Sequence, residues 1–162
     1  MELFLIRHGI AVPGSAVHAD ADRPLTPQGR ERFAQAVMGL QRLGVRLDRL
    51  YHSPWRRAAE TAALLRPVLD GEAVSSAALA RPPSQTLLQE IVGERVALVG
   101  HQPWLGELLV QLLTGVQADG SEFAFKRGGV AWLEGRPKPG RMALRAFLPP
   151  KMLRVLGGVA SP

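Results

Sequence analysis

Residues 2–9, Glu-Leu-Phe-Leu-Ile-Arg-His-Gly, contain the pattern that decides the fold. An apolar run, Glu2–Ile6, is followed at once by Arg7, His8 and Gly9. A run of this length that ends at a charge is typical of a buried β-strand, and it is too short for a secretory signal or a membrane helix. We therefore expect a first strand that ends at Arg7, His8 and Gly9.

Strand and helix patterns alternate along most of the chain. Two pairs of a capping residue and a proline, Thr26-Pro27 and Ser53-Pro54, indicate the starts of two helices, and we expect Ser53 to act as a helix cap. Leu47–Tyr51 predicts a second strand. Val96–Val99 is apolar throughout, as in a parallel strand covered on both faces. This order predicts an α/β fold, a three-layer α/β/α sandwich with a mainly parallel, mixed central sheet.

The remaining segments extend this pattern without dividing the chain. Ile10–Leu25, rich in Pro, Gly and Asp, predicts a long loop, and Gly129–Leu133 with Arg141–Phe147 predicts an antiparallel hairpin. The tail Pro149–Pro162 either covers an edge of the sheet or meets another subunit. Because no repeat or linker interrupts the sequence, we expect one domain over residues 1–162.

Polar residues follow three of the expected strands. These are Arg7-His8-Gly9, His52-Ser53 and Gly100-His101. The carboxyl ends of parallel strands meet at one edge of a sheet, so these residues are expected to share a site with Arg56 or Arg57 from the following helix.

A site of this composition suits phosphoryl transfer. Neutral imidazole is a good nucleophile toward phosphorus, and guanidinium groups hold and neutralise the phosphoryl oxygens. His8 would accept the phosphoryl group, and water would then hydrolyse the phosphohistidine. Gly9 would allow close approach of the backbone.

The three motifs together resemble those of the histidine phosphatase superfamily. Arg7-His8-Gly9 matches the family's tripeptide after the first strand, and Gly100-His101-Gln102-Pro103 matches the segment of its second histidine. Ser53-Pro54-Trp55-Arg56-Arg57-Ala58-Ala59-Glu60-Thr61 fits the pattern of its second arginine, with Arg57 in that position. The resemblance implies a phosphoglycerate mutase-like fold with His8, Arg7, Arg57 and His101 as catalytic residues.

The segment Asp22–Gly29 narrows the resemblance to the small bacterial phosphohistidine phosphatases of the SixA type. That resemblance implies a cytoplasmic, metal-independent hydrolase without a cofactor, acting on histidine-phosphorylated phosphorelay or phosphotransfer proteins. It also implies that Gly9 and Arg23 join Arg7, Arg57 and His101 in binding the substrate. Arg23 is equally suited to pair with Asp20 or Asp22.

A missing carboxylate bears on the substrate. Larger relatives use a carboxylate after the second helix as general acid, whereas the corresponding Ala77–Ser84 contains neither Asp nor Glu. A phosphoramidate needs less help from an acid than an alkoxide leaving group does. A phosphatase of small phosphate esters remains an alternative, with the proton supplied by Asp20, Asp22, His18 or Glu60.

Composition excludes several other classes of protein. The chain has no cysteine, which rules out disulfide frameworks and thiolate nucleophiles. Its net charge of +6, with 17 Arg and 3 Lys, suits an anionic partner but is equally the usage of a GC-rich genome.

Metal-ligand, Walker and GxGxxG motifs are absent. With 6% aromatic residues and no such fold, nucleic acid is not expected as a partner. We expect a monomer, and a non-catalytic phosphate-binding module is the alternative from another class.

Overall fold

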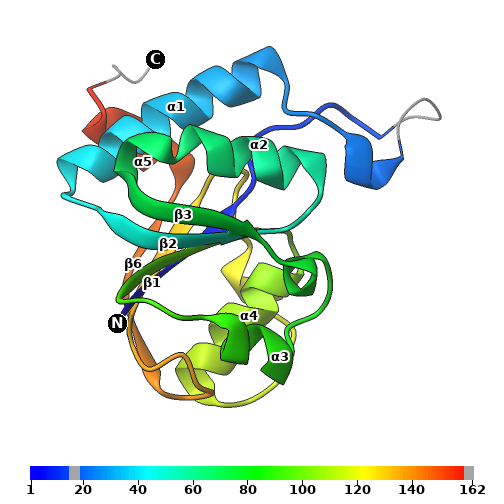
Figure 1. Cartoon of the computed structure of the whole chain (residues 1–162), viewed down its shortest axis with the longest axis vertical. Helices are drawn as coiled ribbons and strands as arrows, with labels where there is room; N and C mark the ends of the chain where they lie inside the picture. The colour runs from blue at the N-terminus through cyan, green and yellow to red at the C-terminus, as the bar shows by residue number, and fades with distance from the viewer. Residues whose placement is uncertain (15–18, 159–162) are drawn as a thin grey trace.

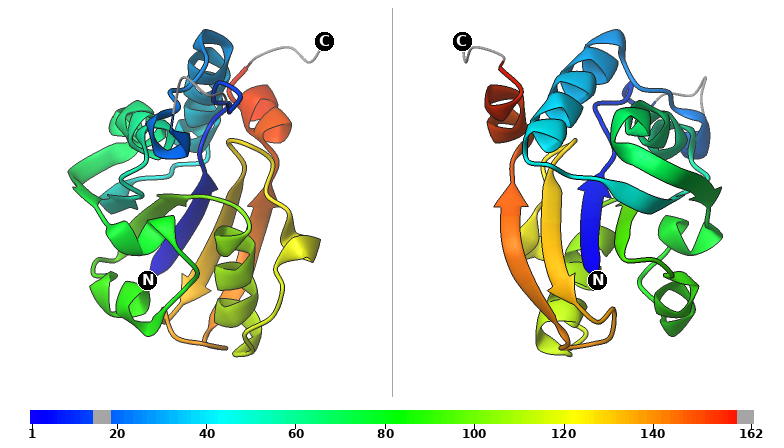
Figure 2. Two further views of the ribbon diagram at one scale, coloured as in Figure 1. Left: turned by 90° about the vertical axis from the view of Figure 1, so that its right-hand side faces the viewer. Right: turned by 60° about the vertical axis from the view of Figure 1, so that its left-hand side comes forward.

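The computed structural model describes residues 1–14 and 19–158. Six strands form one mixed sheet in the order β3-β2-β4-β1-β5-β6. The strands are β1 (Glu2–Arg7), β2 (Leu47–His52), β3 (Leu69–Ser75), β4 (Arg95–Gly100), β5 (Val130–Gly135) and β6 (Met142–Leu148). Strands β1 to β4 are parallel, while β5 runs antiparallel to both of its neighbours, which confirms the expected hairpin. Figure 2 shows β1 and β6 pointing the same way, with β5 reversed between them.

Helices cover both faces of this sheet (Figure 1). They are α1 (Pro27–Arg42), α2 (Arg56–Leu64), α3 (Gln85–Glu90), α4 (Trp104–Thr114) and α5 (Pro150–Leu156), with 3-10 turns η1 (Asp20–Asp22), η2 (Arg66–Val68), η3 (Ala77–Ala80) and η4 (Ser121–Phe123). Helices α1, α2 and α5 lie on one face, and α3 and α4 lie on the other. The predicted three-layer α/β/α sandwich is therefore confirmed.

The sheet has a separate hydrophobic core on each face, because successive side chains of each central strand point to opposite faces. Phe4 and Ile6 of β1 join the core under α1, α2 and α5, whereas Leu3 and Leu5 join the core on the α4 side. Because β1 and β4 bury side chains on both faces, their sequences show no alternation of polar and apolar residues. The polar motifs lie at the carboxyl ends of these strands, so the buried central strands form a rigid base for them.

The start of α1 agrees with its capping signal, and the start of α2 does not. Thr26 Oγ1 accepts from the Gly29 N–H at 2.9 Å, as expected for an N-cap before a proline. Ser53 is not the cap of α2, which begins at Arg56 after Trp55 with no side-chain cap. Instead, Ser53 Oγ accepts from the Trp55 N–H at 3.2 Å within the turn that precedes the helix.

The described part of the tail packs against a helix. Its residues 150–156 form α5, which packs on α1 rather than along an edge strand. Leu153 is fully buried, and its carbonyl oxygen packs closely on Gly39 of α1. A Cβ atom at position 39 would lie only 2.0 Å from this oxygen. In the two described ranges, no helix has the length and apolar character needed to cross a membrane.

Candidate active site

The predicted site residues gather where β1, β2 and β4 end side by side. The backbone ties these ends together: the His8 N–H donates to Gly100 O at 3.1 Å, and the Ser53 N–H donates to Val99 O at 2.9 Å. A cavity of about 350 Å³ opens at this edge. It is lined by Arg7, His8, Ala11, Asp20, Arg23, Trp55, Arg57, His101, Gln102, Trp104 and Arg127. The structure thus brings Arg7, His8, Arg57 and His101 together.

His8 is buried and held in one orientation. Its Nδ1 lies 2.7 Å from Gly9 O, so Nδ1 is protonated and donates to that carbonyl. Its Nε2 then accepts from the Arg57 Nε–H at 3.2 Å. Burial, followed by the charges of Arg57, Arg7 and Arg127, lowers the pKa of His8 to about 3, although the bond to Gly9 opposes the shift. At neutral pH the ring is uncharged, with the Nε2 lone pair toward the arginine.

Arg57 comes from the first turn of α2 and is almost fully buried. Besides its bond to His8, it donates through Nη1 to Asp20 O and through Nη2 to the Asp20 carboxylate at 3.1 Å. Its Cζ lies 4.6 Å from the ring centroid of Trp55, a cation–π distance. Burial lowers the pKa of Arg57, but Asp20 opposes this, and the guanidinium keeps its charge.

Arg7 reaches the cavity from the end of β1. Its Nη1 donates to Phe125 O, which fixes the guanidinium against the segment before β5. Burial and the charges of Arg127 and Arg57 lower its pKa, so these three cations repel one another across the cavity. An anion placed between them would relieve this repulsion.

His101 stands opposite His8, with ring centroids 5.1 Å apart. Its Nε2 lies 2.8 Å from Ser53 Oγ, so Ser53 positions this ring, a role that its expected place as a helix cap did not reveal. Burial, followed by repulsion from the protonated form of His8 and from Arg57, lowers the pKa of His101 to about 3. The rings of Trp55 and Trp104 lie 4.5 and 6.2 Å from it and line the cavity.

Three nitrogen atoms indicate what the cavity can bind. Over the described ranges, the buried side-chain N and O atoms without a hydrogen-bond partner are Arg7 Nε, Arg23 Nε and His101 Nδ1. All three residues line this one cavity. Buried polar atoms are normally paired, so a group of unpaired nitrogens beside two arginines fits the oxygen atoms of a tetrahedral anion.

Arg23 forms the ion pair that its sequence context allowed, and it also lies at the cavity. Its Nη2 lies 2.7 Å from the Asp20 carboxylate, and the residue also lines the cavity. Gly9, by contrast, is not part of the lining. Its N–H donates to Thr61 Oγ1 at 3.0 Å and its carbonyl accepts from His8, so the backbone of Gly9 is directed at neighbouring residues rather than at a ligand.

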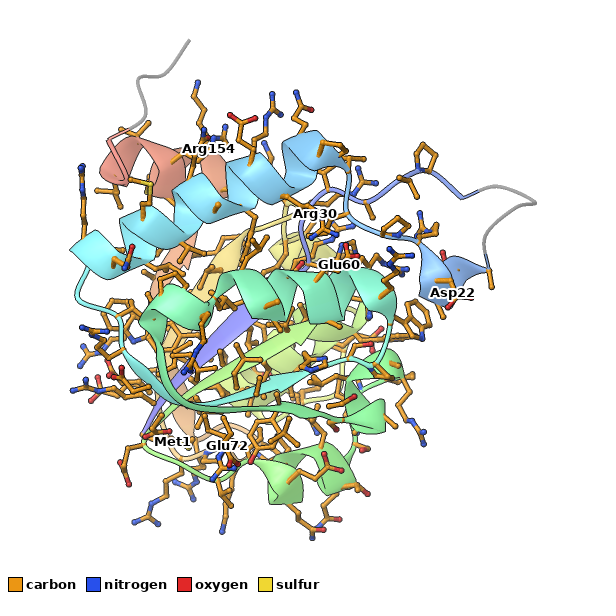
Figure 3. All side chains as sticks on the ribbon, turned by 45° about the horizontal axis from the view of Figure 1, so that its top comes forward. Met1, Asp22, Arg30, Glu60, Glu72 and Arg154 are labelled. Carbon is orange, nitrogen blue, oxygen red and sulfur yellow. The ribbon has the colours of Figure 1, made fainter. Side chains whose placement is uncertain are left out.

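The carboxylates that could donate a proton are engaged in ion pairs or lie away from the cavity. Burial raises the pKa of Asp20, but Arg57 and Arg23 outweigh this and hold the pKa below its usual value. Glu60 accepts from the Leu25 N–H and pairs with Arg30 and Arg56, and Figure 3 shows it on α2 facing Arg30 of α1. Its pKa is also lowered, because these partners outweigh burial.

Two further candidates for the acid lie elsewhere. Asp22 is exposed on η1, away from the body of the sandwich (Figure 3), and does not line the cavity. His18 lies outside the described residues. The stretch Ala77–Ser84 borders a small pocket next to His101 with Ala78, Leu79 and Arg81, which are residues without a proton to give at neutral pH.

Arg127 is a cavity residue that the sequence analysis missed. It follows η4 in a segment without a motif, and it reaches the site because Gly128 N–H donates to the Arg7 and His8 carbonyls at 3.0 and 3.1 Å. The charge of Arg127 lowers the pKa of Arg7 and of His8. The adjacent pair of basic residues before a strand was the one available signal.

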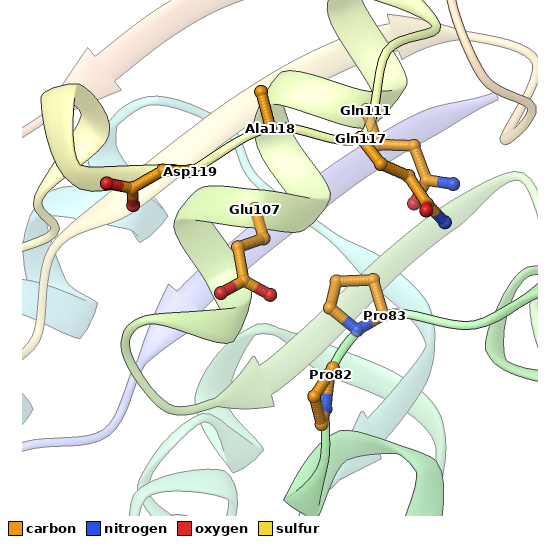
Figure 4. A pocket seen from close by; sticks show the side chains of 7 residues that line it. All are labelled: Pro82, Pro83, Glu107, Gln111, Gln117, Ala118 and Asp119. Atoms are coloured by element: carbon orange, nitrogen blue, oxygen red, sulfur yellow. The ribbon is translucent and has the colours of Figure 1, made fainter.

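A larger pocket of about 410 Å³ lies between α4 and the Pro82-Pro83 turn (Figure 4). Its charged lining residues are Glu107 and Asp119, and its described lining contains no cation. It therefore does not suit a phosphoryl group. Among the residues with described positions, no group of three His, Asp or Glu side chains could hold a metal ion.

Sequence and structure are similar to known proteins. Residues 3–81 match the histidine phosphatase superfamily (branch 1). An uncharacterized protein of Picosynechococcus sp. is 32% identical over 141 residues, which are 82% of this chain and 84% of that protein. The protein histidine phosphatase SixA complexed with tungstate has a TM-score of 0.74 and 25% identity over 93% of this chain and 97% of its own. Phosphoserine phosphatase from Entamoeba histolytica in complex with 3-phosphoglyceric acid has a TM-score of 0.69 and 19% identity over 94% and 98%.

Proposed function

The chain belongs to the histidine phosphatase superfamily, and we propose that it is a phosphohistidine phosphatase, which removes the phosphoryl group from histidine-phosphorylated proteins. The proposed catalytic residues are His8, Arg7, Arg57 and His101, and Arg23 and Arg127 complete the cationic wall. One observation carries the proposal. His8 is neutral, its Nδ1–H is bound to Gly9 O, and its Nε2, which accepts from the Arg57 Nε–H, lies at a cavity lined by arginines.

In the first step, the Arg57 Nε–H exchanges His8 Nε2 for a phosphoryl oxygen, and the Nε2 lone pair so released attacks the phosphorus of the substrate. A new P–Nε2 bond forms while the P–N bond of the substrate histidine breaks, and the electron pair stays on the departing ring nitrogen. Arg7, Arg57 and the free nitrogen of His101 hold the three phosphoryl oxygens as their charge redistributes. The bond from Nδ1 to Gly9 O stabilises the positive charge that His8 gains.

In the second step, water releases the phosphate. Its oxygen bonds to phosphorus, the P–Nε2 bond breaks with its electrons returning to His8, and the proton of the water leaves with the inorganic phosphate. Because His8 then returns to its neutral form, the site is ready for another cycle.

The substrate class rests on the available proton donors. In the described lining, Asp20 is the one carboxylate, and two arginines keep it ionised. An alkoxide leaving group requires a positioned acid, whereas a phosphorylated imidazole leaves with the proton of its own ring. The similarity to SixA supports the same choice.

The direct test compares substrates that differ in their leaving group. Phosphate release is measured from a histidine-phosphorylated carrier protein and from an alkyl phosphate, with a metal chelator present in each assay. We expect turnover of the carrier and little of the alkyl phosphate. In His8→Ala, release should fall by at least about a thousandfold, because the covalent route is lost.

Rapid quenching of the same reaction tests the intermediate. Wild-type protein should carry an acid-labile, alkali-stable phosphoryl group that His8→Ala lacks. Turnover of the alkyl phosphate alone would replace this proposal with an esterase. If both substrates stay intact in the presence of wild type, the chain is a binding module instead.

A further inference from the structure

A second, basic hollow adjoins the active site, and the fold explains its place. Because β6 runs parallel to β1, the chain leaves β6 at the same sheet edge where His8 follows β1. The segment before β5 reaches that edge as well, since Val130 pairs with Ile6. The tail is thus brought beside the active site before it turns into α5.

We call this hollow the basic groove. It has a volume of about 230 Å³, and its cationic residues are Arg32 of α1, Lys126 and Arg127 before β5, and Lys151 and Arg154 of α5. Arg154 is labelled on α5, beside α1, in Figure 3. No carboxylate appears in its described lining, and none of the eight ion pairs found in the described ranges involves these five side chains. An acidic ligand would therefore not have to displace an internal partner.

The groove continues from the catalytic cavity. Arg127 lines both, and Gly9, the residue that follows the nucleophile, lines the groove. A chain whose phosphorylated residue occupies the cavity would extend into the groove with its neighbouring residues.

The composition of the groove indicates a peptide rather than a second phosphate. Its cations come from three separate parts of the chain, α1, the segment before β5 and α5, and the half-buried Pro149 and Pro150 lie in the lining with them. A lining that mixes apolar and charged residues is typical of a protein-docking surface.

We infer that the basic groove docks an acidic segment of the protein substrate, next to the phosphohistidine in the cavity. This inference rests on the proposed function and names the class of partner. It also gives the tail a role, because α5 supplies two of the five charges.

The test uses two histidine-containing peptides of equal length, phosphorylated with phosphoramidate, in which the flanking residues are Glu in one and Gln in the other. At low salt, kcat/KM should be about tenfold higher for the Glu peptide. The ratio should approach one in 1 M salt, where charges are screened within about 3 Å. Lys151→Glu with Arg154→Glu should remove the preference while turnover of an aryl phosphate stays within about twofold.

A matched control makes an equal change of charge at a place far from the groove. Arg136 and Lys138 lie in the β5–β6 turn at the opposite sheet edge, where Glu134 pairs with Glu2. Arg136→Glu with Lys138→Glu should retain the preference for the Glu peptide. If the control loses it equally, or wild type shows none, the groove is not a docking site.

A binding arm separates this inference from the proposed function. The unphosphorylated Glu and Gln peptides, labelled with a fluorophore, are titrated with the His8→Ala protein and with His8→Ala that also carries the two groove substitutions. Tighter binding of the Glu peptide by His8→Ala alone supports the groove even if wild type releases no phosphate. Equal binding of both peptides overturns it even if phosphate is released.

Discussion

Burial among arginines keeps His8 and His101 uncharged, and this lowers the stability of the folded chain at acidic pH. The pKa of His8 is about 3 in the folded chain, against about 6.5 in an unfolded one. Below pH 6.5 the unfolded state takes up the proton first, so the free energy of unfolding falls as the pH is lowered from 6.5 toward 3.

Replacing the nucleophile should reduce this dependence on pH. In His8→Gln, the slope of unfolding free energy against pH between 6 and 4 should be smaller than in wild type by about 1.4 kcal/mol per pH unit, one proton's contribution. Urea unfolding at each pH measures it. Identical slopes would mean that His8 titrates inside the folded protein at its ordinary pKa.

Three of the residues that were predicted to share the site could be placed from the strands alone. Arg7, His8 and His101 lie at the ends of buried strands, so the sheet dictates where they meet, whereas Arg57 was placed by its motif. Arg127 could not be predicted in this way, because backbone contacts with Gly128 place it and no motif marks it. The bond between Ser53 and His101 was equally hidden, since a serine before a proline reads as a cap.

Elements with a buried face were predictable, and those placed by backbone pairing were not. Strand β3 was missed because only Leu69 is buried in it, so its side chains show no usable alternation. It is an edge strand that exists through its pairing with β2. The docking of α5 depends on Gly39, whose lack of a side chain has meaning only once α5 lies against it.

The loop between β1 and α1 depends on one close approach. The Ile10 carbonyl accepts from the Thr26 N–H at 2.9 Å, and it would lie 2.1 Å from a Cβ at Gly29. This loop brings Asp20 and Arg23 to the cavity. In Gly29→Ala we expect the loop to shift, with a loss of about 1–3 kcal/mol of stability and a raised KM.

Gly14→Ala provides the matched control in the same loop, because a Cβ there meets nothing within 4 Å. Thermal unfolding and steady-state kinetics of both variants measure the effect. If the two variants behave alike, the contact between loop and helix does not position the site.

At the scale of the whole molecule, which has a net charge of +6, many cationic side chains gather at the carboxyl ends of the strands, where they line the cavity and the basic groove. Arg57 is buried, Arg7 is half-buried, and both line the cavity with Arg127; partial burial, followed by repulsion from Arg127 and Arg57, lowers the pKa of Arg7. An anion that binds only the folded chain stabilises it by about 2.7 kcal/mol at a hundred times its Kd.

Inorganic phosphate should therefore raise the Tm of wild type with increasing concentration. The rise should be absent in Arg57→Ala, measured against its own Tm without phosphate, because the variant lacks a principal oxygen ligand. Potassium chloride at equal ionic strength is the control, and an equal rise with chloride would point to screening instead of a site.

The bond between Arg57 and Asp20 makes ligand entry an exchange of anions. Both terminal nitrogens of Arg57 are occupied by Asp20, and Nε is occupied by His8. A phosphoryl group that binds this guanidinium must first displace a carboxylate tethered to the same chain. Because the same carboxylate competes with the product for Arg57, we expect phosphate to leave readily and to inhibit turnover only weakly.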